Sequence, residues 1–308
     1  IVCPGFIDIG CDLGDVQDES NNSLEMELYA AASGGFTSVC LLPKSNHTLE
    51  TVEIVEQIYR KSRTSKGAKI RCIAALTKSL EGEILSEMEA LKTAGCVGVS
   101  NGGRPVNNTS VLRNALAYAS SLDLLVMLDS HDAWLNTQGV MRSGAASILA
   151  GLPGIPNSSE LIGLSRNLIL VQETGARAHL RNLSVSGSIN LLDQYPESPT
   201  TCDISLIHLL LCDEDIDPFD PNYNVVPPLP SASDRDILVG HLVDGKIDIL
   251  SSLHQPIAKD LKQCTFESSK PGVSCFDTFL PLMLQLTKKI KLTKVIELIT
   301  HAPAKAWD

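Results

Sequence analysis

Short apolar runs alternate with longer amphipathic stretches along the whole chain. Each apolar run is rich in Val, Ile, Leu or Cys, which is typical of parallel strands buried on both faces. Eight strands are predicted, at Phe6–Asp12, Phe36–Leu42, Ile70–Leu76, Cys96–Ser100, Leu124–Asp129, Ala178–Leu183, Cys202–Ile207 and Ile247–Leu250. Apolar residues at three- and four-residue spacing predict helices at Ser23–Ser33, Thr48–Ser62, Ser79–Thr93, Asn108–Ser121, Ser158–Thr174, Ser186–Gln194, Ser233–Val243, Phe276–Lys288 and Lys291–Thr300.

This alternation predicts an α/β fold, a parallel (β/α)₈ TIM barrel. Such a barrel needs about 250 residues, so the 308 residues fit one domain over 1–308. A doubly wound open sheet is the alternative, but its glycine-rich phosphate loop after the first strand is missing. Two insertions, Asp132–Pro156 and Leu211–Pro230, begin near strand ends, where barrel enzymes build their substrate loops.

Composition narrows the class of protein. The formal net charge is −11, and no basic stripe runs along the chain, which argues against nucleic acid or an anionic membrane as a partner. Nine scattered cysteines include no CxxC pair, as expected of free thiols in a reducing compartment. There is no signal-peptide pattern and no apolar run of the ~18 residues that a membrane span needs. We therefore expect a cytoplasmic protein.

Five collinear segments carry a family resemblance. They read PGFIDIGCDLGD from Pro4, AAASGGFTSVCLLPKSN from Ala30, GLPGIPNSSE from Gly151, NYNVVPPLP from Asn222 and DGKIDILSSLHQPIA from Asp244. Together they resemble the dihydroorotase branch of the amidohydrolase superfamily, over nearly the whole chain. The resemblance implies an amidohydrolase-type barrel and a site for two metal ions at the carboxyl ends of its strands. It also implies a small flanking β-domain, which we expect to be absent from this chain.

The ligand positions that the resemblance implies are mostly altered. The family's first-strand His-x-His pair falls on Gly10 and Asp12, and its fourth-strand carboxylate falls on Asn101 or Gly102. The histidine after the fifth strand is kept as His131, whereas the next one falls on Asn182. The eighth-strand aspartate, in the family both ligand and general base, falls on Leu253. A hydrolytic zinc site needs three or more such ligands, so we expect no metal, no other cofactor and no catalytic residue.

Positions that the resemblance assigns to substrate binding are altered as well. The family's arginine clamp falls on Gly14, its Pro-Asn-Thr asparagine on Lys44, a second histidine on Ile257 and a further arginine on Pro230. Glycine cannot replace a bidentate arginine. The predicted degenerate site therefore consists of Gly10, Asp12, Gly14, Lys44, Asn101, His131, Asn182, Leu253, His254 and Ile257.

Single residues also have plainer interpretations. His131 is interpreted as a polar residue that fills the vacated mouth rather than as a surviving ligand. His179 and His208 are expected within strands, hydrogen-bonded in the barrel, and His254 is expected to be structural. Lys44 is interpreted as a surface cation, because no other sign of Schiff-base chemistry accompanies it.

Three functions remain open. The favoured hypothesis is a non-catalytic dihydroorotase homologue of pyrimidine biosynthesis, which by resemblance would support assembly of aspartate transcarbamoylase. The second is an active zinc dihydroorotase, and the third is a barrel that binds a metabolite in its emptied mouth. The segments Asp12–Asn22 and Leu211–Pro230 are the candidate contact loops, and a homo-oligomer is also possible.

Overall fold

The computed structural model describes residues 2–13, 24–44, 48–136 and 138–307. Its eight-stranded sheet is entirely parallel, which confirms the predicted barrel. In spatial order the strands are β1 (Phe6–Asp8), β2 (Phe36–Leu41), β3 (Lys69–Ala75), β4 (Gly98–Ser100), β5 (Leu125–Asp129), β8 (Ala178–Arg181), β9 (Thr200–Ser205) and β10 (Ile249–Ser251). Beyond β10, the Asp12 amide donates to the His254 carbonyl at 2.6 Å and links the last strand to the first.

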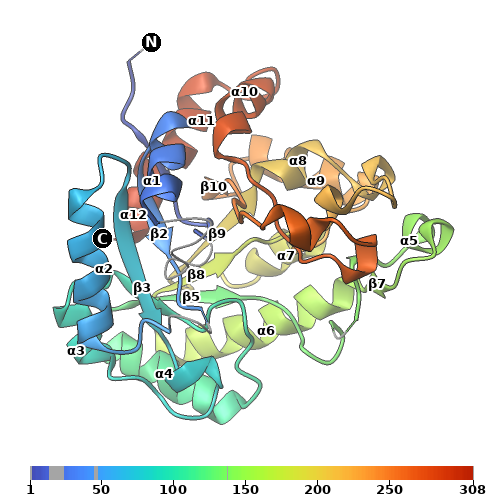
Figure 1. The fold of residues 1–308 in the computed structure, drawn as a ribbon. Helices are drawn as coiled ribbons and strands as arrows, with labels where there is room; N and C mark the ends of the chain where they lie inside the picture. The colour runs from blue at the N-terminus through green and yellow to red at the C-terminus, as the bar shows by residue number, and fades with distance from the viewer. Residues whose placement is uncertain (1, 14–23, 45–47, 137, 308) are drawn as a thin grey trace.

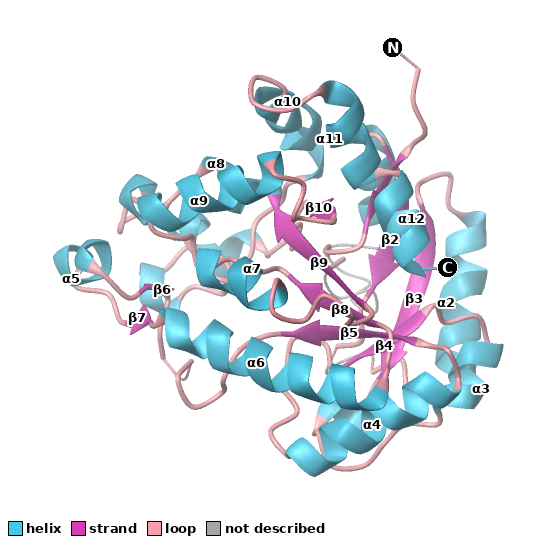
Figure 2. Cartoon of the chain, turned by 180° about the vertical axis from the view of Figure 1, so that it is seen from behind, coloured by secondary structure: helices cyan, strands magenta, loops and turns pink. Residues whose placement is uncertain are grey.

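Helices surround these strands (Figures 1 and 2). They are α1 (Leu24–Ser33), α2 (Val52–Thr64), α3 (Met88–Thr93), α4 (Thr109–Ser121), α6 (Asn157–Thr174), α7 (Ser186–Leu192), α8 (Leu206–Leu210), α9 (Ala232–Val243), α10 (Phe276–Leu286), α11 (Leu292–Ile299) and α12 (His301–Trp307). Aliphatic side chains between strands and helices form one continuous core. None of the described helices is long and apolar enough to cross a membrane.

The predicted helix Ser79–Thr93 is wrong over its first half. Only a short 3-10 turn, Lys78–Leu80, and the later helix α3 are helical there. The Lys78 amide donates to the Ile84 carbonyl at 2.7 Å, and Gly82 has a φ of +77°, so the chain folds back as a tight loop. Glycine adopts that conformation readily, and this local turn outweighs the helical spacing of the apolar residues.

The predicted strand Cys202–Ile207 ends early, at Ser205. The Ser205 hydroxyl accepts a hydrogen bond from the His208 amide and caps helix α8. His208 therefore lies in a helix and not in a strand, which corrects the expectation for this residue. His179 does lie in a strand, β8.

The first insertion contains structure of its own. Strands β6 (Met141–Arg142) and β7 (Gly154–Ile155) pair in parallel, and the short helix α5 (Ala145–Ala150) connects them. This unit projects from the side of the barrel next to the second insertion (Figure 1). The second insertion contains two 3-10 turns, Asp213–Asp215 and Pro221–Tyr223.

Candidate functional site

A cavity of about 250 Å³ opens at the carboxyl ends of the barrel strands. This is the end at which barrel enzymes place their sites. The loops after β1, β2, β4, β5, β8 and β10 contribute to its wall, and so do both insertions. Seven of the predicted site residues meet there: Gly10, Asp12, Lys44, His131, Asn182, Leu253 and His254.

Two other predicted residues, Asn101 and Ile257, do not line this cavity. Asn101 is buried beside it: its amide donates to the carbonyls of Leu80 and Arg104, and its oxygen accepts from Thr77 at 2.6 Å. Its neighbour Gly102 lines the cavity instead, which corrects the expected convergence of Asn101. Ile257 packs against the backbone of Gly272. Gly14 lies outside the described residues.

Two positions to which the family resemblance assigns metal ligands are glycines, Gly10 and Gly102, and their surroundings leave no room for a larger side chain. A Cβ atom on Gly10 would lie 2.8 Å from the Ser251 hydroxyl oxygen and closer still to the Ser251 Cβ. A Cβ on Gly102 would collide with the Pro43 carbonyl oxygen, at a φ of +64°. Neighbouring atoms therefore fill the space at both positions, and neither an imidazole nor a carboxylate fits there without rearrangement.

Two further positions to which the resemblance assigns metal ligands have a left-handed backbone conformation. Asn182 has a φ of +50° and Leu253 a φ of +57°. This left-handed region is tolerated by asparagine but is rare for leucine, and it costs free energy unless the surroundings enforce it. Leu253 is buried in a small apolar cluster with Val225 and Leu229. Both residues closely follow barrel strands, so the strained turns lie at the rim of the cavity.

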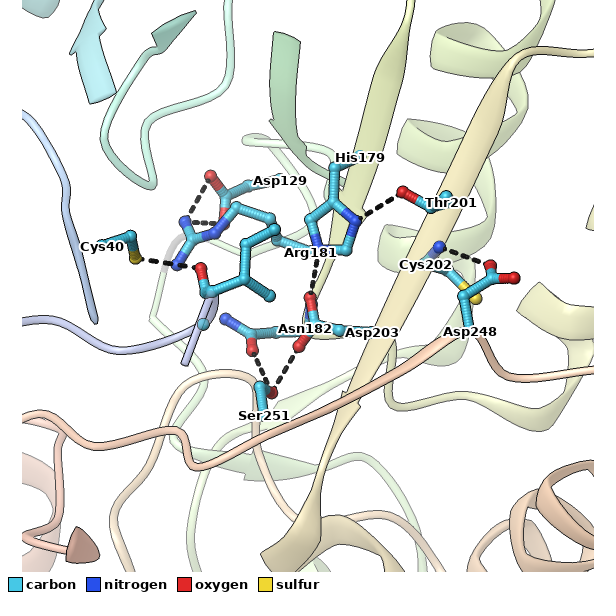
Figure 3. Close-up of polar contacts among 12 residues, drawn as sticks. Cys40, Asp129, His179, Arg181, Asn182, Thr201, Cys202, Asp203, Asp248 and Ser251 are labelled. Atoms are coloured by element: carbon cyan, nitrogen blue, oxygen red, sulfur yellow. Dashed lines mark hydrogen bonds and ion pairs between the residues drawn. The ribbon is translucent and has the colours of Figure 1, made fainter. Parts of the chain in front are cut away.

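Two ion pairs lie in the wall of the cavity. The Lys44 ammonium contacts the Asp12 carboxylate at 2.5 Å, and both side chains are mostly buried. Lys44 is therefore part of the cavity and not the surface cation expected from the sequence. The Arg181 guanidinium donates to both carboxylate oxygens of Asp129, at 3.0 and 3.1 Å (Figure 3). Each carboxylate of the two pairs already has a cation supplied by the chain itself.

A buried polar network lies beneath the cavity. His179 contacts Asp203 through Nε2 at 3.0 Å and Thr201 through Nδ1 at 2.9 Å (Figure 3). Asp203 also accepts hydrogen bonds from the Ser251 hydroxyl and the Asn182 backbone amide. Burial alone would raise the pKa of Asp203, but these hydrogen bonds and the His179 ring lower it overall. Asp203 is thus held as a carboxylate inside the barrel.

His254 is tied into the structure by both ring nitrogens. Its Nδ1 accepts a hydrogen bond from the Cys275 amide at 3.0 Å, so the proton lies on Nε2, which contacts Glu27 at 3.0 Å. The ring also stacks on Phe276, with centroids 3.7 Å apart. These contacts support the structural role expected for His254, although the residue borders the cavity.

The side chains of this site do not fit a zinc centre. No group of three or more His, Cys, Asp or Glu side chains in the described part of the chain is arranged to hold a metal ion. The cavity is lined by five side chains that could ligate a metal: Asp12, Asp129, His131, Glu160 and His254. Asp12 and Asp129 are paired with cations of the chain. Glu160 accepts hydrogen bonds from backbone amides, and both ring nitrogens of His254 are engaged, so the uncommitted ligands are fewer than zinc requires.

Two arginines of the site were missed by the sequence analysis. Arg181 directly precedes Asn182, and a charge at the end of an otherwise apolar strand is a readable signal. Arg142 lies on β6 and reaches the cavity from the first insertion. No family segment surrounds it, so its position could be known only from the fold.

The comparisons with known proteins agree with this architecture. The sequence profile of the family described as Dihydro-orotase-like matches residues 1–187. A dihydroorotase-like protein of Pseudomonas putida is 37% identical over 310 residues, which cover 99% of this chain and 73% of that protein. A dihydroorotase of Solibacter usitatus is 36% identical over 309 residues, with 98% and 72% covered.

Solved structures show the same fold at much lower identity. L-hydantoinase (dihydropyrimidinase) from Arthrobacter aurescens superposes with a TM-score of 0.83 at 19% identity, over 99% of this chain and 71% of that one. Dihydroorotase from Saccharomyces cerevisiae, in complex with 5-fluoroorotic acid, gives a TM-score of 0.78 at 14% identity, over 99% and 85%. At such identities the likeness concerns the fold alone.

Proposed function

Because the chain belongs to the dihydroorotase family of the amidohydrolase superfamily, we propose that it serves pyrimidine biosynthesis without catalysing ring chemistry. In this proposal it acts as a structural partner of aspartate transcarbamoylase. The two relatives from Pseudomonas carry the name dihydroorotase-like protein rather than dihydroorotase. At most positions where the resemblance places a metal ligand or the substrate clamp, this chain has a different residue, which supports the same interpretation.

The observation that carries the proposal is the pair of internal salt bridges in the cavity. A divalent ion at Asp12 would have to displace the Lys44 ammonium, and one at Asp129 would have to displace the Arg181 guanidinium. Leu253 provides neither a metal ligand nor a base. Metal-activated hydrolysis needs both a Lewis acid and a proton acceptor, and these residues supply neither.

Metal content and turnover test the catalytic half of the proposal. Purified protein incubated with zinc and then dialysed is expected to retain well under one zinc ion per chain. Neither closure of carbamoyl aspartate nor hydrolysis of dihydroorotate is expected above background. The substitution Gly10→His with Asp12→His should not restore activity, because Ser251 occupies the space beside residue 10. Two zinc ions per chain, or turnover on the order of 1 per second, would show that the protein is an enzyme.

The second insertion is the candidate contact surface in the described residues. Its Phe219 is 91% exposed, and exposed aromatic residues are frequent anchors of interfaces. The same insertion carries an acidic turn, Asp213–Asp215. Of the other candidate loop, Asp12–Asn22, all but the first two residues lie outside the described part of the chain. Phe219 is therefore the position at which the partnership is best tested.

Co-expression with aspartate transcarbamoylase, followed by size-exclusion chromatography, tests the partnership. Both chains are expected in one peak, and Phe219→Ser is expected to weaken that peak. The matched control is Val243→Ser, because Val243 is also exposed but is the last residue of α9, at the opposite end of the barrel. A stable contact should bury more than about 1,000 Å². Two separate peaks, together with full transcarbamoylase activity in the absence of this chain, would remove the support for a structural partnership.

A further inference from the structure

Arg142 is a buried cation in the wall of the cavity. Its side chain reaches the cavity from β6, and the residue is only 3% exposed. One terminal nitrogen, Nη2, donates to the Ser184 hydroxyl at 2.6 Å and to the Pro228 carbonyl at 3.3 Å. Its Nε is buried without a hydrogen-bond partner in the described structure. The guanidinium therefore borders the cavity and has N–H groups that no described acceptor occupies.

The carboxylates around this cavity are committed to other partners. Asp12 pairs with Lys44 and Asp129 with Arg181. The Glu160 carboxylate accepts from the backbone amides of Ser184 and Val185, each at 3.0 Å, and from the Ser188 hydroxyl at 2.6 Å. These partners occupy the three carboxylates, and the Ser184 hydroxyl, which accepts from Arg142 and donates to Glu160, lies between those two charges, so no carboxylate accepts a hydrogen bond from Arg142 among the described contacts.

The hydrogen bonds of Arg142 in the described structure go to uncharged groups. Burial lowers its pKa, while Glu160, Asp234 and Asp213 attract the guanidinium without accepting a hydrogen bond from it among the described contacts. A buried cation that no anion contacts is costly. An anion that enters the cavity would recover part of this cost.

The cavity wall near Arg142 also contains apolar side chains, which could contact the apolar part of a ligand. Ile155, Pro227, Pro228 and Leu253 line the same cavity as Arg142. Its volume of about 250 Å³ corresponds to roughly eight water molecules at about 30 Å³ each, which is enough for a ring with one substituent. Ligand sites commonly combine such an apolar lining with a few placed polar groups.

We infer that the cavity binds a small organic monoanion, with a carboxylate on Arg142 and an apolar body against the proline-rich wall. A guanidinium recognises a carboxylate through paired, charge-assisted hydrogen bonds. The site uses the first insertion and not position 14, where the resemblance places the substrate clamp. The inference is independent of the proposed assembly role, since a binding cavity is compatible with either outcome of that test.

Fluorine NMR with 4-fluorobenzoate and 4-fluorobenzamide tests the inference on the native chain. The two probes have nearly the same shape, but only the benzoate carries a charge. We expect the benzoate to bind at least about tenfold more tightly than the benzamide, which corresponds to about 1.4 kcal/mol. Equal affinity for both probes, or no binding of the benzoate, would overturn the inference.

Variants then assign the effect to Arg142. Arg142→Met removes the charge and is expected to reduce benzoate binding at least about tenfold, with benzamide binding unchanged. The control Arg113→Met also removes one positive charge, but Arg113 is exposed and paired with Glu173 on the outer helices, so benzoate binding should stay native. Arg142→Lys, which keeps the charge if Arg142→Met does not fold, should bind benzoate more weakly than the native chain. Native benzoate affinity in either Arg142 variant would contradict the assignment.

Discussion

At the scale of single residues, the cavity is marked by two internal charge pairs. The Asp12 and Asp129 carboxylates in the cavity each contact a cation of the chain directly, and those cations are Lys44 and Arg181. Such pairs contribute little net stability when both partners are present, because desolvation offsets the attraction. Removing one partner lowers stability, because the other charge is left buried without a counter-charge.

Asp129→Asn is expected to lower the free energy of unfolding by roughly 3 kcal/mol. The side chains of Arg181 and Asp129 are only 5% and 17% exposed, so water cannot replace the lost carboxylate. Urea unfolding at pH 7 provides the measurement. The control is Asp123→Asn, whose side chain is 74% exposed beside Arg177 and which should cost less than about 1 kcal/mol. Similar losses in both variants would mean that the buried pair has no special role.

The sequence predicted these residues only in part. Gly10 and Leu253 could be assigned to the cavity because each closely follows a strand within a segment that resembles the family, and Asn182 because it lies near the end of a predicted strand, directly after β8. After the fourth strand the sequence left Asn101 and Gly102 open, and the turn after β4 presents Gly102 to the cavity and directs Asn101 toward Thr77. The direction of one side chain in a tight turn depends on backbone dihedrals that no apolar pattern encodes.

At the scale of elements, close approach of helix α6 positions the residues after β5. Gly163, in the middle of α6, faces the backbone of His131. A Cβ at this position would lie 2.5 Å from the His131 nitrogen and 2.7 Å from its carbonyl carbon. The glycine therefore permits the contact that fixes one wall of the cavity.

Gly163→Ala is expected to destabilise the protein by about 1–3 kcal/mol, because the added methyl group overpacks against backbone. Alanine within a helix normally gains about 0.5–1 kcal/mol over glycine. Gly240→Ala in α9 provides the comparison, since a Cβ there meets no atom within 4 Å and should stabilise. Thermal unfolding of both variants should thus shift in opposite directions. An increase in the midpoint for Gly163→Ala would show that α6 can move away at little cost.

Elements differed in how well the sequence predicted them. The eight barrel strands were predicted because strands buried on both faces read as apolar runs, and each prediction overlaps its strand. The stretch 79–87 was misassigned because its apolar residues have helical spacing but fold into a loop around Gly82. The unit β6–α5–β7 has strands of two residues, too short to leave a periodic signal.

At the scale of the whole molecule, one buried histidine links folding to pH. The His208 ring contacts the Ser205 hydroxyl through Nδ1 at 2.6 Å and the Pro227 carbonyl through Nε2 at 3.0 Å. A carbonyl only accepts, so Nε2 carries the proton and Nδ1 accepts from the Ser205 hydroxyl. Burial, helped by the nearby Arg142 charge, lowers the pKa of His208 from 6.5 to about 4. The folded protein therefore holds this ring neutral.

The sign of the effect follows from which state binds the proton. Between pH 6.5 and about 4 the unfolded chain protonates this histidine and the folded chain does not, so stability falls as the pH falls. Over pH 7 to 5 this single group should remove about 2 kcal/mol from the free energy of unfolding.

His208→Gln keeps a donor and an acceptor but cannot titrate. Urea unfolding at both pH values should therefore show a pH dependence smaller by about 2 kcal/mol in this variant, whereas His301→Gln, at an exposed position, should leave the native dependence intact. If His208→Gln loses as much stability between pH 7 and 5 as the native chain does, the neutral ring in α8 is not the group that titrates.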